Sequence, residues 1–187
     1  MPKVGMEPIR RDALVKATIT EIGRAGSLDV TVAQIARRAG MSTALAHHYF
    51  GGKDKLLLAA MRHILSIYGG GVRGSLRGLT APEERLRAIV NASFAPVNFR
   101  GEVVSAWLNF YVQAQHSAEA RRLLCIYQRR LRSNLLHDLR KRTPRDAAGM
   151  AETAAALIDG LYIRAALGEE ITSETAAMRV LDVLGIR

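Results

Sequence analysis

The segment from Ser42 to Lys53 concentrates hydroxyl, imidazole, phenol and ammonium groups beside alanines and a leucine. Hydroxyl groups hydrogen-bond base edges in the DNA major groove, and alkyl side chains contact the thymine methyl group there. Imidazole, phenol and ammonium groups suit phosphate oxygens, which fix a protein's position and much of its affinity on DNA. The segment therefore predicts an interface with double-stranded DNA. With Thr31 upstream, the expected contact residues are Ser42, Thr43, Ala44, Leu45, His47, His48, Tyr49 and Lys53.

Two short helices would position this segment, and their caps can be read directly. Thr31 and Gln34 match a capping box, so a helix is expected to start at Thr31 and to stop at Gly40, where glycine tolerates a positive φ. Ser42 can cap a second helix over residues 43–49. Two short helices joined by a glycine-containing turn are typical of a helix-turn-helix. A helical hairpin that merely packs would show the same pattern.

The helical pattern continues on both sides of this motif. Residues 9–25 carry apolar side chains near helical spacing and end before Gly26, which suits a left-handed cap. Ala46 and Phe50 lie one turn apart and are expected to face inward. Further helices are expected over residues 83–97, 103–115 and 146–167. An apolar stripe runs through Ala120, Leu124, Tyr127, Leu131, Leu135 and Leu139. The chain is therefore expected to be all-α.

Composition limits the classes of protein that fit. The chain has 187 residues, 49% of them hydrophobic, and a formal net charge of +10, which suggests a polyanionic partner. No apolar run approaches the roughly 18 residues of a membrane helix, and the N-terminus lacks the apolar middle of a signal peptide. A cytoplasmic protein without a membrane partner is expected. The single Cys125 fits a reducing compartment and is expected to be a small buried side chain.

Residues 69–74, GGGVRG, interrupt a leucine-rich helical segment. Glycine costs about 1 kcal/mol per helical position relative to alanine, so the helix is expected to end early or kink there. The run matches the G-x-G-x-x-G dinucleotide fingerprint, but a helix precedes it where the fingerprint requires a strand. Two interpretations stay open: a hinge between domains and a frayed helix end.

Residues 31–42 (TVAQIARRAGMS) and 49–56 (YFGGKDKL) resemble the DNA-binding signature of the TetR family of bacterial repressors. The resemblance implies a helix-turn-helix domain over residues 1–52 and a helical ligand-binding and dimerisation domain over residues 53–187. It also implies a homodimer on a palindromic operator, with the last two long helices of each chain in a four-helix bundle. Many relatives have glycine in place of Ala44 and tyrosine in place of His47, so the operator sequence cannot be transferred.

Within that family, residues 106–108 (AWL) and 157–167 (LIDGLYIRAAL) resemble the choline-responsive repressors of glycine betaine synthesis. Choline is then the expected inducer, and its quaternary ammonium has no hydrogen to donate and needs aromatic faces and a carboxylate. The expected ligand-binding residues are Trp107, Phe110, Tyr111, Asp159 and Tyr162. The alternatives are that these aromatic side chains are core packing, that Asp159 pairs with Arg164 or with a residue across the dimer, and that the inducer is a different small ligand.

Enzyme chemistry finds little support. His47 and His48 are adjacent, so their side chains diverge by about 100° on a helix and do not share a metal ion easily. Cys125 has no obvious histidine partner, and no carboxylates are paired in an apolar setting. No catalytic residue, metal or cofactor is therefore expected. A nonspecific DNA-coating protein driven by the positive charge is the remaining rival, and it predicts weak discrimination between DNA sequences.

Overall fold

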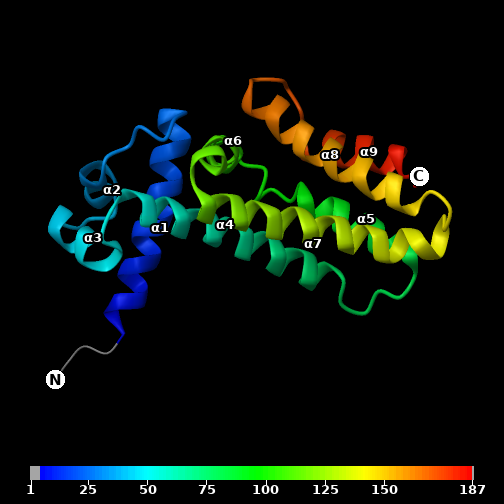
Figure 1. The fold of residues 1–187 in the computed structure, drawn as a ribbon, viewed down its shortest axis with the longest axis horizontal. Helices are drawn as coiled ribbons and strands as arrows, with labels where there is room; N and C mark the ends of the chain where they lie inside the picture. The colour runs from blue at the N-terminus through cyan, green and yellow to red at the C-terminus, as the bar shows by residue number, and fades with distance from the viewer. Residues whose placement is uncertain (1–4, 187) are drawn as a thin grey trace.

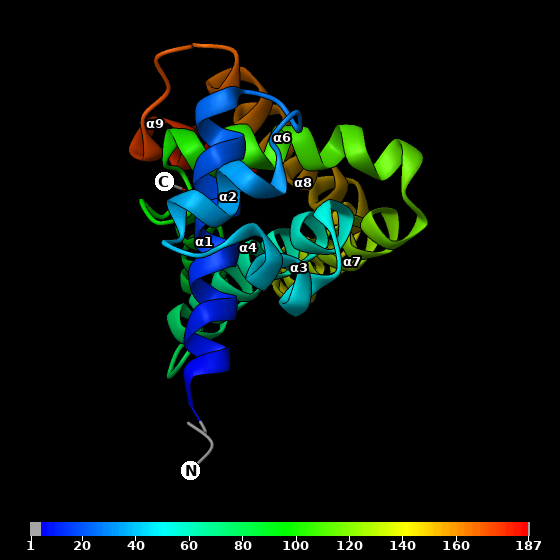
Figure 2. The same cartoon turned by 90° about the vertical axis from the view of Figure 1, so that its left-hand side faces the viewer.

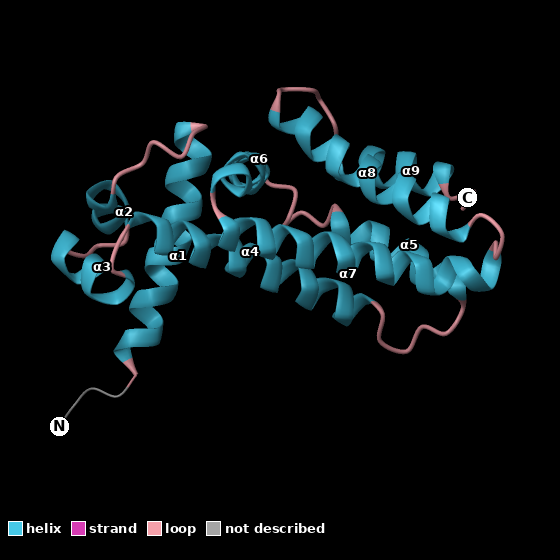
Figure 3. Ribbon diagram, viewed as in Figure 1, coloured by secondary structure: helices cyan, strands magenta, loops and turns pink. Residues whose placement is uncertain are grey.

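The computed structural model describes residues 5–186, and within that range the chain forms helices joined by loops, with no strand (Figure 3). The all-α prediction is confirmed. The helices are α1 (Met6–Ala25), α2 (Val32–Arg38), α3 (Thr43–Phe50), α4 (Lys53–Ser75), α5 (Pro82–Ser93), α6 (Gly101–His116), α7 (Ala118–Arg142), α8 (Ala147–Ala166) and α9 (Ser173–Val183). None of these helices is long and apolar enough to cross a membrane.

The first three helices form a small head at one end of the molecule (Figure 1). The capping box at the start of α2 is present: the Thr31 amide donates to Gln34 Oε1 at 2.7 Å, and the Gln34 amide donates to Thr31 Oγ1 at 3.1 Å. The Ser42 hydroxyl accepts from the Leu45 amide at 3.2 Å and starts α3. Gly40 has φ 67°, as the tight turn between these helices requires.

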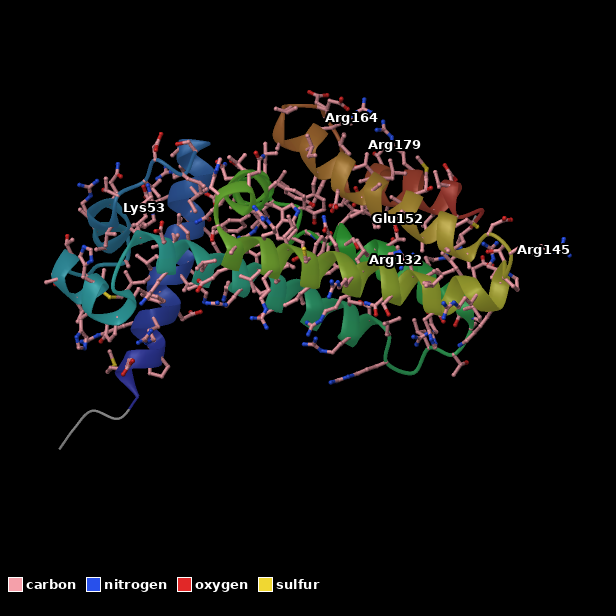
Figure 4. The ribbon with its side chains drawn as sticks, in the orientation of Figure 1. Lys53, Arg132, Arg145, Glu152, Arg164 and Arg179 are labelled. Atoms are coloured by element: carbon pink, nitrogen blue, oxygen red, sulfur yellow. The ribbon has the colours of Figure 1, made fainter. Side chains whose placement is uncertain are left out.

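A continuous apolar core joins this head to the rest of the chain. Leu14 and Ile22 of α1, Ile35 of α2, Ala46 of α3 and Leu56 of α4 are completely buried. The helices α4, α5, α7 and α8 run along the length of the molecule, whereas α6 crosses them (Figures 1 and 2). The predicted stripe on α7 is buried inside this bundle, and only Leu124 is partly exposed. Arg132 of α7 also pairs with Glu152 of α8 at 2.7 Å (Figure 4).

Several sequence expectations are corrected by the structure. The glycine run does not end α4, which continues to Ser75 because Val72 inside the run packs into the core with 2% of its surface exposed. The α5 helix begins at Pro82 but ends at Ser93, since the chain turns before Pro96. Cys125 is exposed, so the prediction of a buried thiol was wrong. The short α9 helix was not anticipated, although the Thr172 hydroxyl caps it by accepting from the Thr175 amide.

Candidate DNA-binding face and ligand cavity

The outer face of α3 presents polar groups to solvent. The α3 helix lies in the head, at the end of the molecule that faces the viewer in Figure 2. Thr43, Ala44, His47 and His48 are exposed as predicted, whereas Leu45 is only partly exposed. The Thr31 and Ser42 hydroxyls are occupied by their capping hydrogen bonds, so they mark helix N-termini at this face. Lys53 begins α4 at the same end of the molecule, far from Arg145 at the other end (Figure 4).

A second set of predicted residues meets at a cavity in the bundle. Four aromatic side chains line it, one from each of four helices: Tyr68 of α4, Trp107 of α6, Tyr127 of α7 and Tyr162 of α8. The Trp107 and Tyr127 ring centroids are 4.9 Å apart, and those of Tyr68 and Tyr127 are 5.5 Å apart. The free space at the centre of the cavity is about 20 Å³, room for one water molecule. A larger ligand therefore requires these rings to move.

The phenol groups around the cavity are tied to fixed partners. The Tyr127 hydroxyl donates to Asp159 Oδ1 at 3.1 Å, and the Tyr162 hydroxyl donates to the carbonyl oxygen of Ser93. The Tyr68 hydroxyl lies 3.4 Å from Ser93 Oγ. The Ile64, Leu65, Ser93, Asn98 and Val103 side chains complete the wall. No lysine, arginine or histidine of the described chain lines it.

Burial controls the ionisation of these groups. Desolvation raises the pKa of the Asp159 carboxyl above its usual value, and hydrogen bonding from the Tyr111 and Tyr127 hydroxyls opposes the rise. Burial likewise raises the pKa of Tyr68 to about 12, so its phenol stays neutral at physiological pH. Among the described residues, Asp159 is thus the carboxylate nearest the phenols of the cavity, and its charge carries a desolvation cost that a nearby cation would reduce.

The predicted ligand residues separate into three groups. Trp107 and Tyr162 line the cavity, whereas Asp159 lies behind Tyr127. The buried Tyr111 hydroxyl has no hydrogen bond of good geometry, but it lies near Asp159. Asp159 raises the pKa of Tyr111, and the Tyr111 hydroxyl lowers the pKa of Asp159. Phe110 is completely buried in the core, and its ring centroid lies 6.4 Å from that of Trp107.

The alternative partner considered for Asp159 is excluded within the described chain. Arg164 pairs with Glu169 at 2.6 Å, so its guanidinium is directed away from the cavity. Sequence reasoning missed Tyr68 and Tyr127. Tyr127 was recognised as a member of the α7 stripe, but nothing in the sequence brings α4 and α7 together at one point.

One close contact connects the cavity to the head. Gly23 in the last turn of α1 lies against the first turn of α6, where an added Cβ would be 2.6 Å from the Glu102 Cα atom. Asn109 of α6 also donates to the carbonyl oxygen of Gly26 at 3.3 Å. Because α6 also carries Trp107, the helix that forms part of the cavity wall packs directly against α1.

No group of three or more His, Cys, Asp or Glu side chains within residues 5–186 is placed to hold a metal ion. The two predicted functional regions therefore rest on hydroxyl, aromatic and charged groups alone.

Comparisons with known proteins identify the family. Residues 14–60 match the family described as bacterial regulatory proteins, tetR family, and the chain therefore belongs to the TetR family. Residues 82–184 match the BetI-type transcriptional repressor C-terminal family, so this is more narrowly a repressor of the BetI type.

Curated relatives and solved structures carry the same descriptions. The chain is 52% identical over 183 residues to the HTH-type transcriptional regulator BetI of Brucella suis, covering 97% of this chain and 92% of the relative. It is 56% identical over 168 residues to BetI of Agrobacterium fabrum, covering 89% and 82%. A transcriptional regulator from Saccharomonospora viridis, solved in complex with choline, has the same fold with a TM-score of 0.83 at 24% identity, covering 94% of this chain and 95% of that one. These relatives are transcription regulators rather than enzymes.

Proposed function

We propose that this repressor leaves a palindromic operator when choline enters the aromatic cavity, and that it thereby controls glycine betaine synthesis. The observation that carries the proposal is a cavity lined by four aromatic rings and, among the described residues, no basic side chain, with Asp159 hydrogen-bonded to one of those rings through the Tyr127 hydroxyl. Support comes from the relatives named BetI and from the S. viridis regulator of the same fold, which was solved with choline.

The cavity chemistry favours a quaternary ammonium over other small ligands. Such a cation is attracted to the faces of Trp107, Tyr127 and Tyr162 without needing a hydrogen bond. The Asp159 carboxylate supplies the opposite charge through the Tyr127 hydroxyl. A carboxylate-bearing ligand would be buried without a basic partner, which is unfavourable. The site is therefore expected to accept choline and to reject an anion of similar size.

Release from DNA follows from the small size of the cavity. A ligand must push Trp107 or its neighbours outward, and Trp107 lies on the helix that packs backbone to backbone against α1 at Gly23. We expect this movement to turn the head and to change the distance between the two recognition helices of a dimer. Occupation of successive major grooves requires that distance to be about 34–36 Å. Choline would thus favour the dimer state that fits DNA less well.

Homodimerisation is part of the same proposal, with the last two long helices of each chain, α7 and α8, in a four-helix bundle. The apolar stripe of α7 is buried within its own chain, so it is not free for a second copy. The apolar side chains left exposed on the last two helices are Ile163 of α8 and Met178 and Val183 of α9. Ile126 on the other side of α7 is exposed as well, so we expect α7 and α8 to form the dimer contact, with α9 beside them.

The test is binding of purified protein to DNA from upstream of its own gene, measured by fluorescence anisotropy with and without choline. We expect tight binding that is weakened by choline and not by glycine betaine at equal ionic strength. A scrambled duplex should bind far more weakly. Equal binding to both duplexes would instead favour the nonspecific DNA-coating protein, and selective binding indifferent to choline would favour a repressor with another inducer.

A further inference from the structure

Two arginines near the start of α1 contact the last turn of the recognition helix. Arg10 Nη1 donates to the Tyr49 hydroxyl oxygen at 3.3 Å. The Arg11 guanidinium carbon lies 5.6 Å from the Tyr49 ring centroid and 5.2 Å from the Phe50 ring centroid. Arg11 Nε is also held by Glu7 Oε1 at 2.8 Å, which fixes the guanidinium over the rings. The end of α3 and the start of α1 therefore form one cluster.

The hydrogen bond from Arg10 determines what the Tyr49 hydroxyl can do next. Its oxygen already accepts a hydrogen from Arg10, so its own hydrogen remains available to an outside acceptor. No carboxylate within residues 5–186 forms an ion pair with Arg10. A phenol hydrogen and an uncompensated guanidinium are thus presented together, and both suit a phosphate oxygen.

The surface beside this cluster is positively charged. A cleft of about 360 Å³ is lined by Arg11, Lys55 and Arg62, together with the rings of Tyr49 and Phe50. Its only acidic lining residue is Glu119 at the start of α7. Guanidinium groups bind phosphate oxygens through two parallel hydrogen bonds, which makes arginine well suited to hold a DNA backbone in one orientation.

We propose that Arg10, Arg11 and Tyr49 form a phosphate-binding site that holds the operator backbone beside the groove entered by α3. The ligand is a phosphodiester of the DNA backbone. The inference rests on the proposed operator binding and adds α1 to the helices that contact DNA. In this account Arg10 both contacts the phosphate and positions the Tyr49 hydroxyl.

The test compares Arg10→Gln, Arg11→Gln and the matched control Arg24→Gln. Arg24 is exposed on the same helix, about 20 Å from Arg10 at a rise of 1.5 Å per residue, and its replacement removes the same charge. Operator affinity is measured by anisotropy over a series of salt concentrations. Arg10→Gln and Arg11→Gln should each weaken operator binding about tenfold and lower the slope of log affinity against log salt by about one, since each removes a phosphate contact. Arg24→Gln should leave the slope unchanged.

Preference for operator over scrambled DNA should stay the same in all three variants, because phosphate contacts carry no base information. Combining Arg10→Gln with Tyr49→Phe should cost less than the sum of the two single effects, since the two groups act as one unit. Equal slopes for all arginine variants, or fully additive effects in the double variant, would overturn the inference. Wild-type protein that failed to select its operator would contradict the proposed function instead.

Discussion

The outer face of α3 presents Thr43, His47 and His48 to solvent, whereas Asp159 is only partly exposed and accepts a hydrogen bond from Tyr127. Under the proposed function, the exposed groups need little rearrangement before they meet DNA. The Asp159 carboxylate is partly desolvated, and the cavity near it has room for only one water molecule. The head would therefore be preformed for DNA, whereas the cavity would have to open for a ligand.

Under the proposed function, this difference would let a small cation control binding to DNA. A ligand that binds equally well to two states shifts nothing between them, however tightly it binds. A cavity that is closed in one state and open in the other would meet that requirement, because choline would fit only the open state. Variants in the head, in the cavity and at the contact between them test this difference.

The largest expected effect concerns charge buried in the bundle. Asp138 is fully buried and accepts from Arg85 Nε at 3.0 and 3.1 Å. Removing one partner of a buried pair leaves an uncompensated charge, so Asp138→Ala should lower the free energy of unfolding by about 3–5 kcal/mol. The exposed pair of Asp12 and Lys16 in the head is the control, and Asp12→Ala should cost less than about 1 kcal/mol. Chemical denaturation measures both, and similar losses would contradict the contrast.

Asp159→Asn should separate ligand binding from stability. The amide keeps an acceptor for the Tyr127 hydroxyl but lacks the charge that attracts a cation. A hydrogen bond or contact to a charged group is worth about 1.5–3 kcal/mol, so choline affinity should fall roughly ten- to hundredfold. The variant should be at least as stable as the wild type at neutral pH, because it removes a desolvated carboxylate. Calorimetric titration and thermal unfolding give the two readouts, and unchanged choline affinity would exclude Asp159 from the site.

The raised pKa of Asp159 gives stability and ligand binding opposite pH dependences. The folded protein holds this proton more tightly than the unfolded chain, so its contribution to stability is complete below the unfolded pKa of about 3.9 and is lost as pH rises through the folded pKa. Choline binding needs the charged carboxylate and should strengthen over the same rise in pH. Titrating choline binding and unfolding temperature against pH tests both signs. Asp159→Asn should abolish both trends, and persistence of either trend in that variant would assign it to another group.

Gly23→Ala should disturb the connection between the two regions. The new Cβ would lie 2.6 Å from the Glu102 Cα atom and 2.8 Å from the Glu102 carbonyl oxygen, so α1 and α6 must move apart. Overpacking of this kind costs about 1–3 kcal/mol of stability. We also expect the ratio of operator affinities with and without choline to decrease, as measured by anisotropy. A variant with wild-type stability and an unchanged ratio would show that this contact does not transmit the change.

The smallest expected effect concerns the glycine run of α4. Gly70 lies inside the helix, and an added Cβ would have no neighbouring atom within 4 Å. Gly70→Ala should therefore stabilise the protein by up to about 1 kcal/mol through helix propensity alone. Its operator affinity and choline response should match the wild type if α4 does not bend there. A lost choline response in a stabilised variant would instead support the hinge interpretation of residues 69–74.

The head was predictable from the sequence because its information is local. The Thr31 and Gln34 capping box, the Ser42 cap and the turn at Gly40 each involve residues only a few positions apart. The cavity required more than that. Trp107 and Tyr162 could be chosen by residue type, but Tyr68 and Tyr127 join them only through the packing of α4 against α7.

At the glycine run and at Cys125, predictions from local sequence were wrong. Helix propensity predicted a break at residues 69–74, yet burial of Val72 outweighs the cost of the glycines and α4 continues. The thiol of Cys125 was assigned to the interior from residue type, whereas its position on α7 faces away from the buried stripe. Both outcomes depend on tertiary packing, which cannot be predicted from a short segment of sequence.

Calorimetric titration of choline tests most directly whether the cavity and the head are energetically coupled. Choline is titrated into the free protein and into the protein saturated with operator DNA. Coupling is reciprocal, so choline affinity should fall on operator binding by the same factor as operator affinity falls on choline binding. Equal choline affinities in the two titrations would contradict the account, because they would show that the two sites do not influence each other.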